Sequence, residues 1–455
     1  MERRQFLKTV GGTAAVSAAV LTGCGEVKRP GASPPPRTPD DIPKDKMTYR
    51  VHPRSGDKVS LLGFGCMRFP FLPVGAGGGE ELIDQDAVNE MIDYALDHGV
   101  NYFDSSPVYC RGLSERATGI ALSRHKRDKF FVSTKLSNMS QGARSREASI
   151  AMYRNSFKQL QVDYIDYYLV HSVANYEIFK QRYLDNGMLD FLLAEREAGR
   201  IRHFGWSFHG EKEFFDWTLT PECGVDWDFV LIQLNYLDWR HATGRNVNAE
   251  YLYGELQKRN IPAMVMEPLL GGRLARTNYK AQGMLKQAEP EKSAASWALR
   301  FAGSPPGVLT VLSGMTYLEH LKDNLRTYCP LNPLSGSEYK LLEEVARVIL
   351  DFQTINCTEC NYCMPCPYGL DIPGIIMHYN RCLNEGNFPN VNDEENYQRA
   401  RRAFLIGYDR AIPKLRQAAM CTKCNLCHPE CPQFIRISDE MEKIDQFVEK
   451  LRKEK

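Results

Sequence analysis

Apart from a weakly apolar stretch at positions 10–21, the sequence has no apolar run of the ~20 residues that a membrane-spanning helix requires. Neither sign of charge is in excess, because 57 Lys and Arg face 56 Asp and Glu and the formal net charge is +1. A chain without a strongly basic balance is not expected to bind nucleic acid or an anionic membrane surface through charge. Composition therefore argues against a helical membrane channel and against a nucleic-acid-binding protein.

A complete glycine motif for dinucleotide binding is also missing. The glycine-rich string GAGGGE at 75–80 departs from G-x-G-x-x-G at its last position, and no helix start follows it directly. Clustered glycines of this kind are typical of a flexible loop, which is what the string predicts.

The N-terminus has the shape of an export signal. The paired arginines of ERRQFLK at 2–8 precede the weakly apolar stretch, and this pattern resembles the twin-arginine signal that directs folded proteins for export. The string LTGC at 21–24 resembles the lipobox of bacterial lipoproteins, which would place a lipid on Cys24. We therefore expect a signal at 1–23, a Pro-rich linker at 24–47 and a lipid-anchored protein on the periplasmic side of a bacterial envelope.

The fourteen cysteines are distributed unevenly, since eight of them form two short runs near the C-terminus. The first run, CTECNYCMPCP, contributes Cys357, Cys360, Cys363 and Cys366, and the second run, CTKCNLCHPECP, contributes Cys421, Cys424, Cys427 and Cys431. The second run has the C-x2-C-x2-C-x3-C-P spacing of bacterial ferredoxins, in which the cysteine before proline often ligates the other cluster. These eight residues are therefore predicted to hold two [4Fe–4S] clusters.

Two other uses of these cysteines are less consistent with their spacing. Structural zinc usually takes two C-x2-C pairs with roughly 15 to 20 residues between them, whereas here four thiols crowd together. Disulfides suit an exported protein, but such dense strings are a poor framework for separate bridges. The first run departs from the ferredoxin spacing by one residue before Cys366. The long, helical stretch between the runs predicts that residues 334–455 form an α-helical ferredoxin-like domain.

The middle of the chain, residues 48–333, alternates short apolar runs with amphipathic stretches. Expected strands are residues 59–65, 100–104, 130–136, 164–171, 201–207, 229–235, 262–268 and 307–314. A helical pattern such as residues 85–99 lies between successive strands. Eight strands and helices in about 280 residues fit a (β/α)8 TIM barrel, whose usual size is ~250 residues, so the fold class is α/β.

Active sites of such barrels lie at the carboxyl ends of the strands, where this chain places ionisable groups. Asp104 ends the second expected strand, Tyr109 follows in the loop, Lys135 lies near the end of the third, and His171 ends the fourth. A lysine in an apolar run needs a partner, which Asp104 can supply. The positive charge of Lys135 is expected to lower the pKa of Tyr109, so that Tyr109 can protonate a carbonyl oxygen positioned by His171.

These strings resemble the motifs of aldo-keto reductases across the whole barrel. The likeness lies in FDSSPVY at 103–109, STK at 133–135 and YIDYYLVH at 164–171. It implies a carbonyl–alcohol reaction on a small molecule, with the four residues above as its catalytic groups. The appended cysteine runs resemble a bacterial subgroup with C-terminal iron–sulfur domains.

The same resemblance assigns residues to a nicotinamide nucleotide. Ser207 and Gln233 are expected to hold the nicotinamide amide, and Gly314 and Asn324 belong to the nucleotide motif after the last strand. Several neighbouring positions depart from the family pattern: Phe208 replaces an asparagine, Met266 replaces a stacking tyrosine, and Glu267 places a carboxylate near the pyrophosphate. NAD(P) is therefore an open cofactor assignment.

Three functions remain open from the sequence. In the first, a two-electron carrier connects the clusters with Tyr109 in a redox-linked carbonyl reductase or alcohol dehydrogenase. In the second, the clusters transfer electrons to a redox protein partner and the barrel is a scaffold or docking surface. In the third, the clusters are structural and the barrel is an ordinary reductase. His209, just after the fifth strand, is a further candidate for the substrate pocket.

Overall fold

The structure is a computed structural model that describes residues 42–72, 81–244 and 246–454. The expected signal at 1–23, Cys24, most of the linker and the glycine-rich string at 75–80 lie outside these residues. Within them, no helix is both long enough and apolar enough to cross a membrane.

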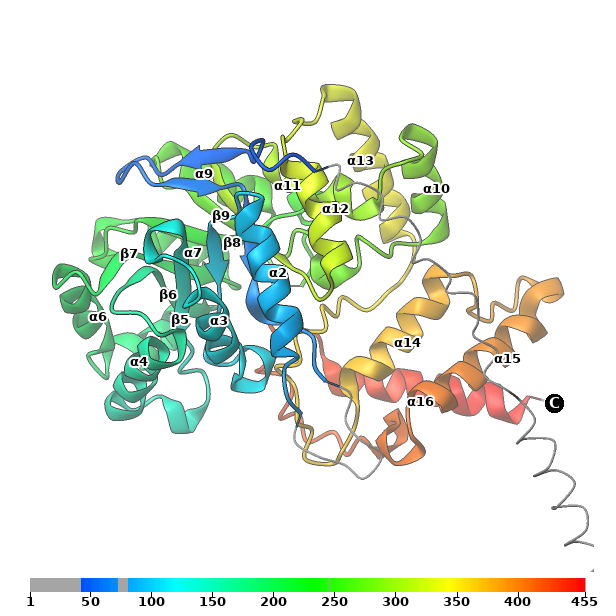
Figure 1. Ribbon diagram of the computed structural model, residues 1–455. Helices are drawn as coiled ribbons and strands as arrows, with labels where there is room; N and C mark the ends of the chain where they lie inside the picture. The colour runs from blue at the N-terminus through cyan, green and yellow to red at the C-terminus, as the bar shows by residue number, and fades with distance from the viewer. Residues whose placement is uncertain (1–41, 73–80, 245, 455) are drawn as a thin grey trace, which may run out of the picture. The chain divides into compact units, whose positions relative to one another are not determined.

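Eight parallel strands close into a barrel, as the alternating sequence pattern predicts (Figure 1). Around the barrel the strands follow the order β10, β3, β4, β5, β6, β7, β8, β9, so that each strand pairs with its neighbour in the chain. Their bounds are β3 (Leu62–Gly65), β4 (Tyr102–Asp104), β5 (Phe131–Leu136), β6 (Ile165–Val173), β7 (Ile201–Phe208), β8 (Phe229–Gln233), β9 (Ala263–Met266) and β10 (Val308–Gly314). The predicted (β/α)8 fold is confirmed.

Alternate residues of each strand face the inside and the outside of the barrel. In β6, Tyr167 and Leu169 pack in a cluster inside the barrel, whereas Tyr168 and Val170 pack in the layer beneath the helices. All four are buried, which explains why the strand reads as a continuous apolar run. A packed interior makes the barrel a rigid support for groups at its rim.

The first expected strand is divided in two. Its beginning, β2 (Lys58–Ser60), pairs antiparallel with β1 (Tyr49–Val51), and only β3 enters the barrel. The buried apolar residues Val59, Leu61, Leu62 and Phe64 continue from β2 into β3, so the sequence pattern alone does not separate a hairpin from a barrel strand.

Helices surround the strands and connect them. They are α2 (Gln85–Asp97), α3 (Ser114–Leu122), α4 (Arg146–Leu160), α5 (Tyr176–Phe179), α6 (Met188–Glu197), α7 (Lys212–Thr218), α8 (Asp238–His241), α9 (Ala249–Lys258), α10 (Tyr279–Ala288), α11 (Ala294–Gly303) and α12 (Leu318–Tyr328). Asp84 caps α2 by accepting a hydrogen bond from the amide of Ala87, which starts the helix close to its predicted position.

The C-terminal region is helical, as predicted. Its first helix, α13 (Gly336–Leu350), packs on the barrel core through Leu342, Val345 and Ile349. A separate core begins at Ile355 and is built mainly by α14 (Ile372–Asn384), α15 (Glu394–Ala411) and α16 (Ile437–Lys453), which lie side by side (Figure 1). The cysteine runs precede α14 and α16, at the edge of this second core.

Candidate active site

The four residues expected to be catalytic lie at one rim of the barrel. Asp104 ends β4, Lys135 lies near the end of β5, and His171 lies near the end of β6. Tyr109 begins the short 3-10 helix η2 (Tyr109–Gly112), which follows β4. The carboxyl ends of neighbouring parallel strands thus bring together residues that are distant in the sequence.

Lys135 and Asp104 form a buried ion pair. The Lys135 ammonium nitrogen lies 2.5 Å from an Asp104 carboxylate oxygen, and the two side chains are 1% and 4% exposed. The ammonium also donates to the Ser105 carbonyl, while the Ser133 hydroxyl donates to the other Asp104 oxygen at 2.9 Å. These hydrogen bonds satisfy charges that would otherwise be costly to bury.

Tyr109 lies beside this ion pair, but its acidity differs from the sequence-based expectation. The Lys135 nitrogen is 4.8 Å from the centre of the Tyr109 ring. Burial nevertheless raises the pKa of Tyr109 well above 10, and the nearby Tyr362, Asp104 and Glu267 add to the shift. The expectation of a lowered pKa was wrong because the sequence shows the neighbouring charge but not the loss of hydration. Tyr109 is therefore a phenol that keeps its proton.

His171 is held as a neutral ring. Burial lowers its pKa well below 6.5, and the positive charge of Lys135 lowers it further. Its Nδ1 hydrogen-bonds the Ser137 hydroxyl at 2.6 Å, and its ring centre lies 6.1 Å from that of Tyr109. With Nδ1 engaged, Nε2 is the ring atom left to contact a substrate oxygen.

Two further residues support or extend the site around His171. The guanidinium of Arg182 is buried and donates to the His171 carbonyl at 2.7 Å, which fixes the end of β6. Beside His171, His209 has a buried Nδ1 with no hydrogen-bond partner among the described residues. Burial lowers the pKa of His209 to about 4, so this ring is also neutral.

The residues expected to hold a nicotinamide nucleotide lie at the ends of later strands, and each already has a protein contact. The Ser207 hydroxyl accepts from the Ser172 amide, and Asn324 donates to the Ser313 hydroxyl. Gly314 faces the side chain of Arg68. Gln233 donates to the Asp238 carboxylate at 2.5 Å and accepts from Gln433 at 3.1 Å.

The first cysteine run contacts the residues expected to be catalytic. Tyr362, between Cys360 and Cys363, hydrogen-bonds Tyr109, and its ring centre lies 6.3 Å from that of His171. The sequence analysis missed this residue because the run was interpreted only as a set of ligands. The one local signal was an aromatic residue between two closely spaced cysteines.

The eight motif cysteines group across the two runs. Cys357, Cys360, Cys363 and Cys431 line one pocket. Burial raises the pKa of Cys427, and electrostatic interaction with the thiols of Cys421, Cys424 and Cys366 adds to this shift. The cysteine before proline in each run therefore belongs with the three cysteines of the other run.

Among the described residues, no group of three or more His, Cys, Asp or Glu side chains has the arrangement of a metal-ion site. The cysteine grouping is nonetheless the one expected for two clusters with exchanged fourth ligands. Thiolates that hold a four-iron cluster surround a multi-atom group and do not converge on one ion. The chemistry and grouping of the donors therefore fit such clusters.

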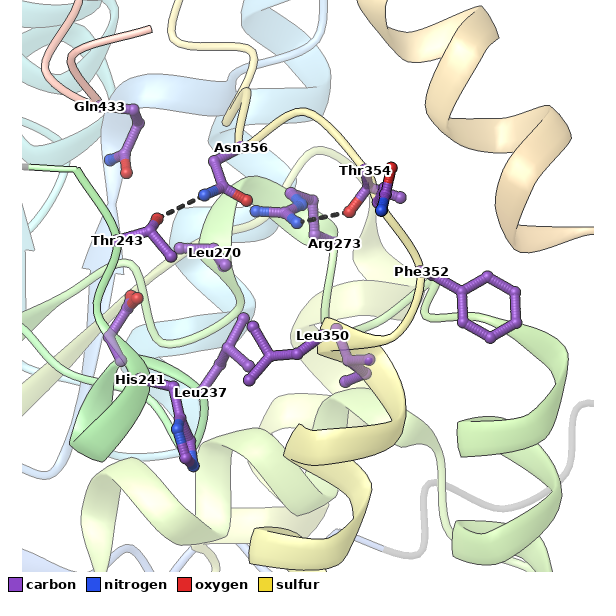
Figure 2. A pocket seen from close by; sticks show the side chains of 13 residues that line it. Leu237, His241, Thr243, Leu270, Arg273, Leu350, Phe352, Thr354, Asn356 and Gln433 are labelled. Atoms are coloured by element: carbon purple, nitrogen blue, oxygen red, sulfur yellow. Dashed lines mark hydrogen bonds between the residues drawn. The ribbon is translucent and has the colours of Figure 1, made fainter.

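A pocket of about 140 Å³ opens between the barrel rim and the segment that leads to the first cysteine run (Figure 2). Leu237, Leu270 and Leu350 form an apolar wall. On its polar side Arg273 donates to the Thr354 hydroxyl at 2.9 Å, and Asn356 donates to the Thr243 hydroxyl. These bonds join the segment at 354–356 to the loops after β8 and β9.

The rim of the (β/α)8 barrel thus carries a buried lysine–carboxylate pair, a protonated tyrosine and a neutral histidine. The family model described as "Aldo/keto reductase family" matches residues 62–347. The chain therefore belongs to the aldo/keto reductase family.

Curated relatives match parts of the barrel. "Probable aldo-keto reductase 1" of Glycine max is 35% identical over 158 residues, 33% of this chain and 42% of the relative. "Protein tas" of Escherichia coli is 29% identical over 189 residues, 35% of this chain and 52% of the relative. The chain thus spans about half the length of these relatives or less.

Solved structures share the barrel over a longer range. An aldo-keto reductase from Bacillus halodurans in its holo form is 22% identical, with a TM-score of 0.52 over 66% of this chain and 96% of that chain. An aldo/keto reductase from Klebsiella pneumoniae in complex with NADP and acetate is 22% identical, with a TM-score of 0.50 over 67% of this chain and 95% of that chain. At this identity the likeness shows a common fold.

Proposed function

We propose that this protein interconverts a small-molecule carbonyl and its alcohol at Tyr109, and that two [4Fe–4S] clusters held by the eight motif cysteines serve in electron transfer. The observation that carries the proposal is the contact of Tyr362 with Tyr109 and His171. Through this contact the first cysteine run adjoins the residues proposed to be catalytic, which supports a common function for the two parts.

The chemistry at Tyr109 follows from burial and charge. Because its pKa is raised, Tyr109 keeps its proton until a carbonyl oxygen is in position to accept it. Lys135 then stabilises the phenolate that remains, and Asp104 holds Lys135 in place. General acid catalysis of this kind is typically worth ~10²- to 10⁴-fold in rate. In the direction of alcohol oxidation the same phenolate accepts the hydroxyl proton.

His171 and His209 supply binding rather than proton transfer. Both rings are neutral because burial lowers their pKa values. A neutral His171 ring with Nδ1 on Ser137 can donate from Nε2 to the substrate oxygen and orient it toward Tyr109. The unpartnered Nδ1 of His209 is a second polar group for a substrate that carries more than one oxygen.

The cysteines divide into two ligand sets. Cys357, Cys360, Cys363 and Cys431 would hold the cluster nearer Tyr109, and Cys421, Cys424, Cys427 and Cys366 would hold the other. When bound, each cluster takes up or releases one electron at a time. Conversion of an alcohol to a carbonyl removes a proton from oxygen, which the Tyr109 phenolate accepts, and a hydride from carbon. A two-electron carrier would have to accept that hydride and pass its electrons singly to the clusters. A redox protein partner would exchange electrons with them.

Two alternatives give other functions to the same parts. Clusters that only stabilise the fold would leave an ordinary reductase, whereas an inactive barrel would leave an electron-transfer protein. The intact ion pair between Lys135 and Asp104 favours an active barrel, because a scaffold has no need for it.

The fold makes a nicotinamide cofactor a candidate, since the Klebsiella pneumoniae protein with this fold was solved with NADP and acetate. The residues present in this chain do not fit that cofactor in the described arrangement, because Gln233 and the loop after β9 contact C-terminal residues. No step of the reaction is therefore assigned to a nucleotide.

Export is part of the proposal because clusters are built in the cytoplasm. A twin-arginine route carries folded proteins, which suits a chain that must bind its clusters before transport. Lipid attachment at Cys24 would then hold the protein on the periplasmic side of the envelope. Incorporation of labelled fatty acid into wild-type protein, and none into a Cys24→Ala variant, is the expected result. Labelling of both proteins would reject this anchor.

The reaction is tested with Tyr109→Phe in anaerobically purified protein. Turnover is measured on a panel of carbonyl compounds with reduced viologen as electron donor and on alcohols with ferricyanide as acceptor. We expect a loss of ~10²- to 10⁴-fold with unchanged iron content, because only the proton donor is removed. The control is Tyr176→Phe, since Tyr176 is exposed and packs on Trp217. Equal turnover in both variants would remove Tyr109 from the reaction.

A further inference from the structure

Two parts of the expected nucleotide site, Gln233 and the loop after β9, contact the chain's own C-terminal residues. The clearest case is Gln233, whose buried side-chain amide is engaged at both ends by Asp238 and Gln433. Gln433 is itself held by Asn246 at 3.1 Å. A nicotinamide amide could bind Gln233 only after this side-chain network opened.

A second contact lies at the loop after β9, in the 3-10 helix η7 (Leu270–Gly272). A Cβ atom added to Gly271 would meet the Thr358 carbonyl oxygen at 2.4 Å and its Cα at 2.5 Å. The backbone of Thr358 therefore lies directly on the loop that begins with Glu267, the residue expected near the pyrophosphate. Backbone in this position leaves no room for a phosphate group.

Arg68 fixes the same segment from the other side. Its guanidinium donates to the carbonyls of Thr358 at 2.5 Å and Glu359 at 3.2 Å, and its stem covers Gly314. The positive charge of Arg68, which could have neutralised a phosphate, is thus bound to backbone carbonyls of residues 358 and 359. Nearby, the partly buried Glu267 carboxylate would repel an anion if it were ionised.

The space left beside these contacts is small. The pocket of Figure 2 measures about 140 Å³, whereas pockets for drug-sized ligands typically measure ~300–1,000 Å³. Its wall includes Thr354, Asn356 and Gln433, which belong to the covering segments. A dinucleotide is larger than the ligands to which that range refers.

We propose that segment 354–363 and Gln433 take the place of the nicotinamide nucleotide in this chain, so that the cluster-loaded protein binds neither NADH nor NADPH at the Tyr109 site. The inference rests on the proposed function above, because it concerns the cofactor of that site. The segment then has two roles, since Cys357, Cys360 and Cys363 serve as ligands while Thr358 and Tyr362 close the barrel rim.

The first test is nucleotide binding by the full, cluster-loaded chain. NADH and NADPH are titrated by isothermal calorimetry up to about 1 mM, the upper end of typical KM values, and denatured protein is analysed for released nucleotide. We expect no saturable binding and no released nucleotide. Saturable binding of either nucleotide, or about one nucleotide released per chain, would overturn the inference.

The second test uses two neighbouring glycines of η7 as a matched pair. Gly271 and Gly272 both have positive φ, so alanine strains the backbone at either position. At Gly272, however, a Cβ would meet only the tip of the Arg276 side chain at 3.6 Å. We expect Gly271→Ala to displace Thr358 and lower the iron content, while Gly272→Ala retains the wild-type iron content. Equal iron in the two variants would show that the segment does not lie on η7.

These outcomes are separate from the test of the proposed reaction. If Tyr109→Phe abolishes turnover but NADPH binds, the reaction stands and the closed nucleotide site is rejected. If neither nucleotide binds but Tyr109→Phe retains full turnover, the closed site stands and the proposed reaction is rejected. Should Gly271→Ala fail to fold, the titration of the wild-type protein still decides the inference.

Discussion

The buried ion pair between Lys135 and Asp104 leads to a quantitative prediction about the stability of the protein. Lys135→Met keeps a long side chain and removes the charge, which leaves the Asp104 carboxylate with the Ser133 hydroxyl as its described hydrogen-bond donor. Stranding one member of a buried pair costs about 3–5 kcal/mol. We expect Lys135→Met to lower the free energy of unfolding by that amount, which is a large part of the ~5–15 kcal/mol that stabilises a typical domain.

Two companion variants separate the pair from general effects of substitution. The double variant Lys135→Met with Asp104→Leu leaves no unpaired buried charge. Its free energy of unfolding should therefore be at least ~1 kcal/mol higher than that of Lys135→Met alone. Lys212 makes an exposed ion pair with Asp216, and Lys212→Met should cost less than ~1 kcal/mol.

The assay is urea unfolding followed by tryptophan fluorescence. All five tryptophans lie within residues 206–297, so their fluorescence reports on the barrel, whereas visible absorbance would report on the proposed clusters. A cost below ~1 kcal/mol for Lys135→Met, or a double variant no more stable than Lys135→Met, would refute the reasoning.

Three further predictions follow from the cysteine grouping and from two side chains. Cys431→Ser should alter the electron paramagnetic resonance signal of the proposed cluster near Tyr109, because Cys431 groups with the cysteines of the first run. Cys366→Ser should alter the signal of the second proposed cluster, because Cys366 groups with the cysteines of the second run. If each variant altered the signal of the opposite cluster, the grouping would be wrong. His209 has its pKa lowered from 6.5 to about 4, so its contribution to stability is complete above pH 6.5 and is lost as the pH falls toward 4. The free energy of unfolding should therefore fall by about 1–3 kcal/mol more over this window than in His209→Gln; parallel pH profiles would contradict the burial of this ring. Tyr362→Phe removes a hydroxyl that would compete with the substrate for Tyr109. Loss of a competing hydrogen bond of ~1 kcal/mol should lower KM about fivefold, with unchanged iron content. An unchanged or higher KM would exclude this competition.

Local patterns determine most of the barrel. The eight predicted strands all occur because a buried parallel strand needs a continuous apolar run and each run here is followed by an amphipathic helix. The division between β2 and β3 could not be predicted, since hairpin and barrel pairing use the same extended, apolar residues. The packing of α13 on the barrel could not be predicted either, because an amphipathic sequence does not specify which surface its apolar face will contact.

The positions of the candidate catalytic residues were predictable for a geometrical reason, and the rest of the candidate site was not. Parallel strands bring Asp104, Lys135 and His171 to one rim wherever the barrel closes, so their positions follow from the strand ends. The raised pKa of Tyr109 depends on burial by residues outside the barrel motifs. Tyr362 and Gln433 reach the site only through tertiary packing, which no local pattern of their own segments encodes.

The position of Tyr362 couples two properties that would otherwise be independent. It lies between Cys360 and Cys363, so binding of both thiolates to one cluster would fix the backbone on either side of it. The same residue hydrogen-bonds Tyr109, and thus the conformation of the cysteine loop determines what faces the proposed proton donor. Gly271 extends the coupling, because the contact with Thr358 requires a residue without a side chain on the loop after β9. In this chain the barrel loop and the cysteine run are complementary surfaces, and a nucleotide could enter only if both moved.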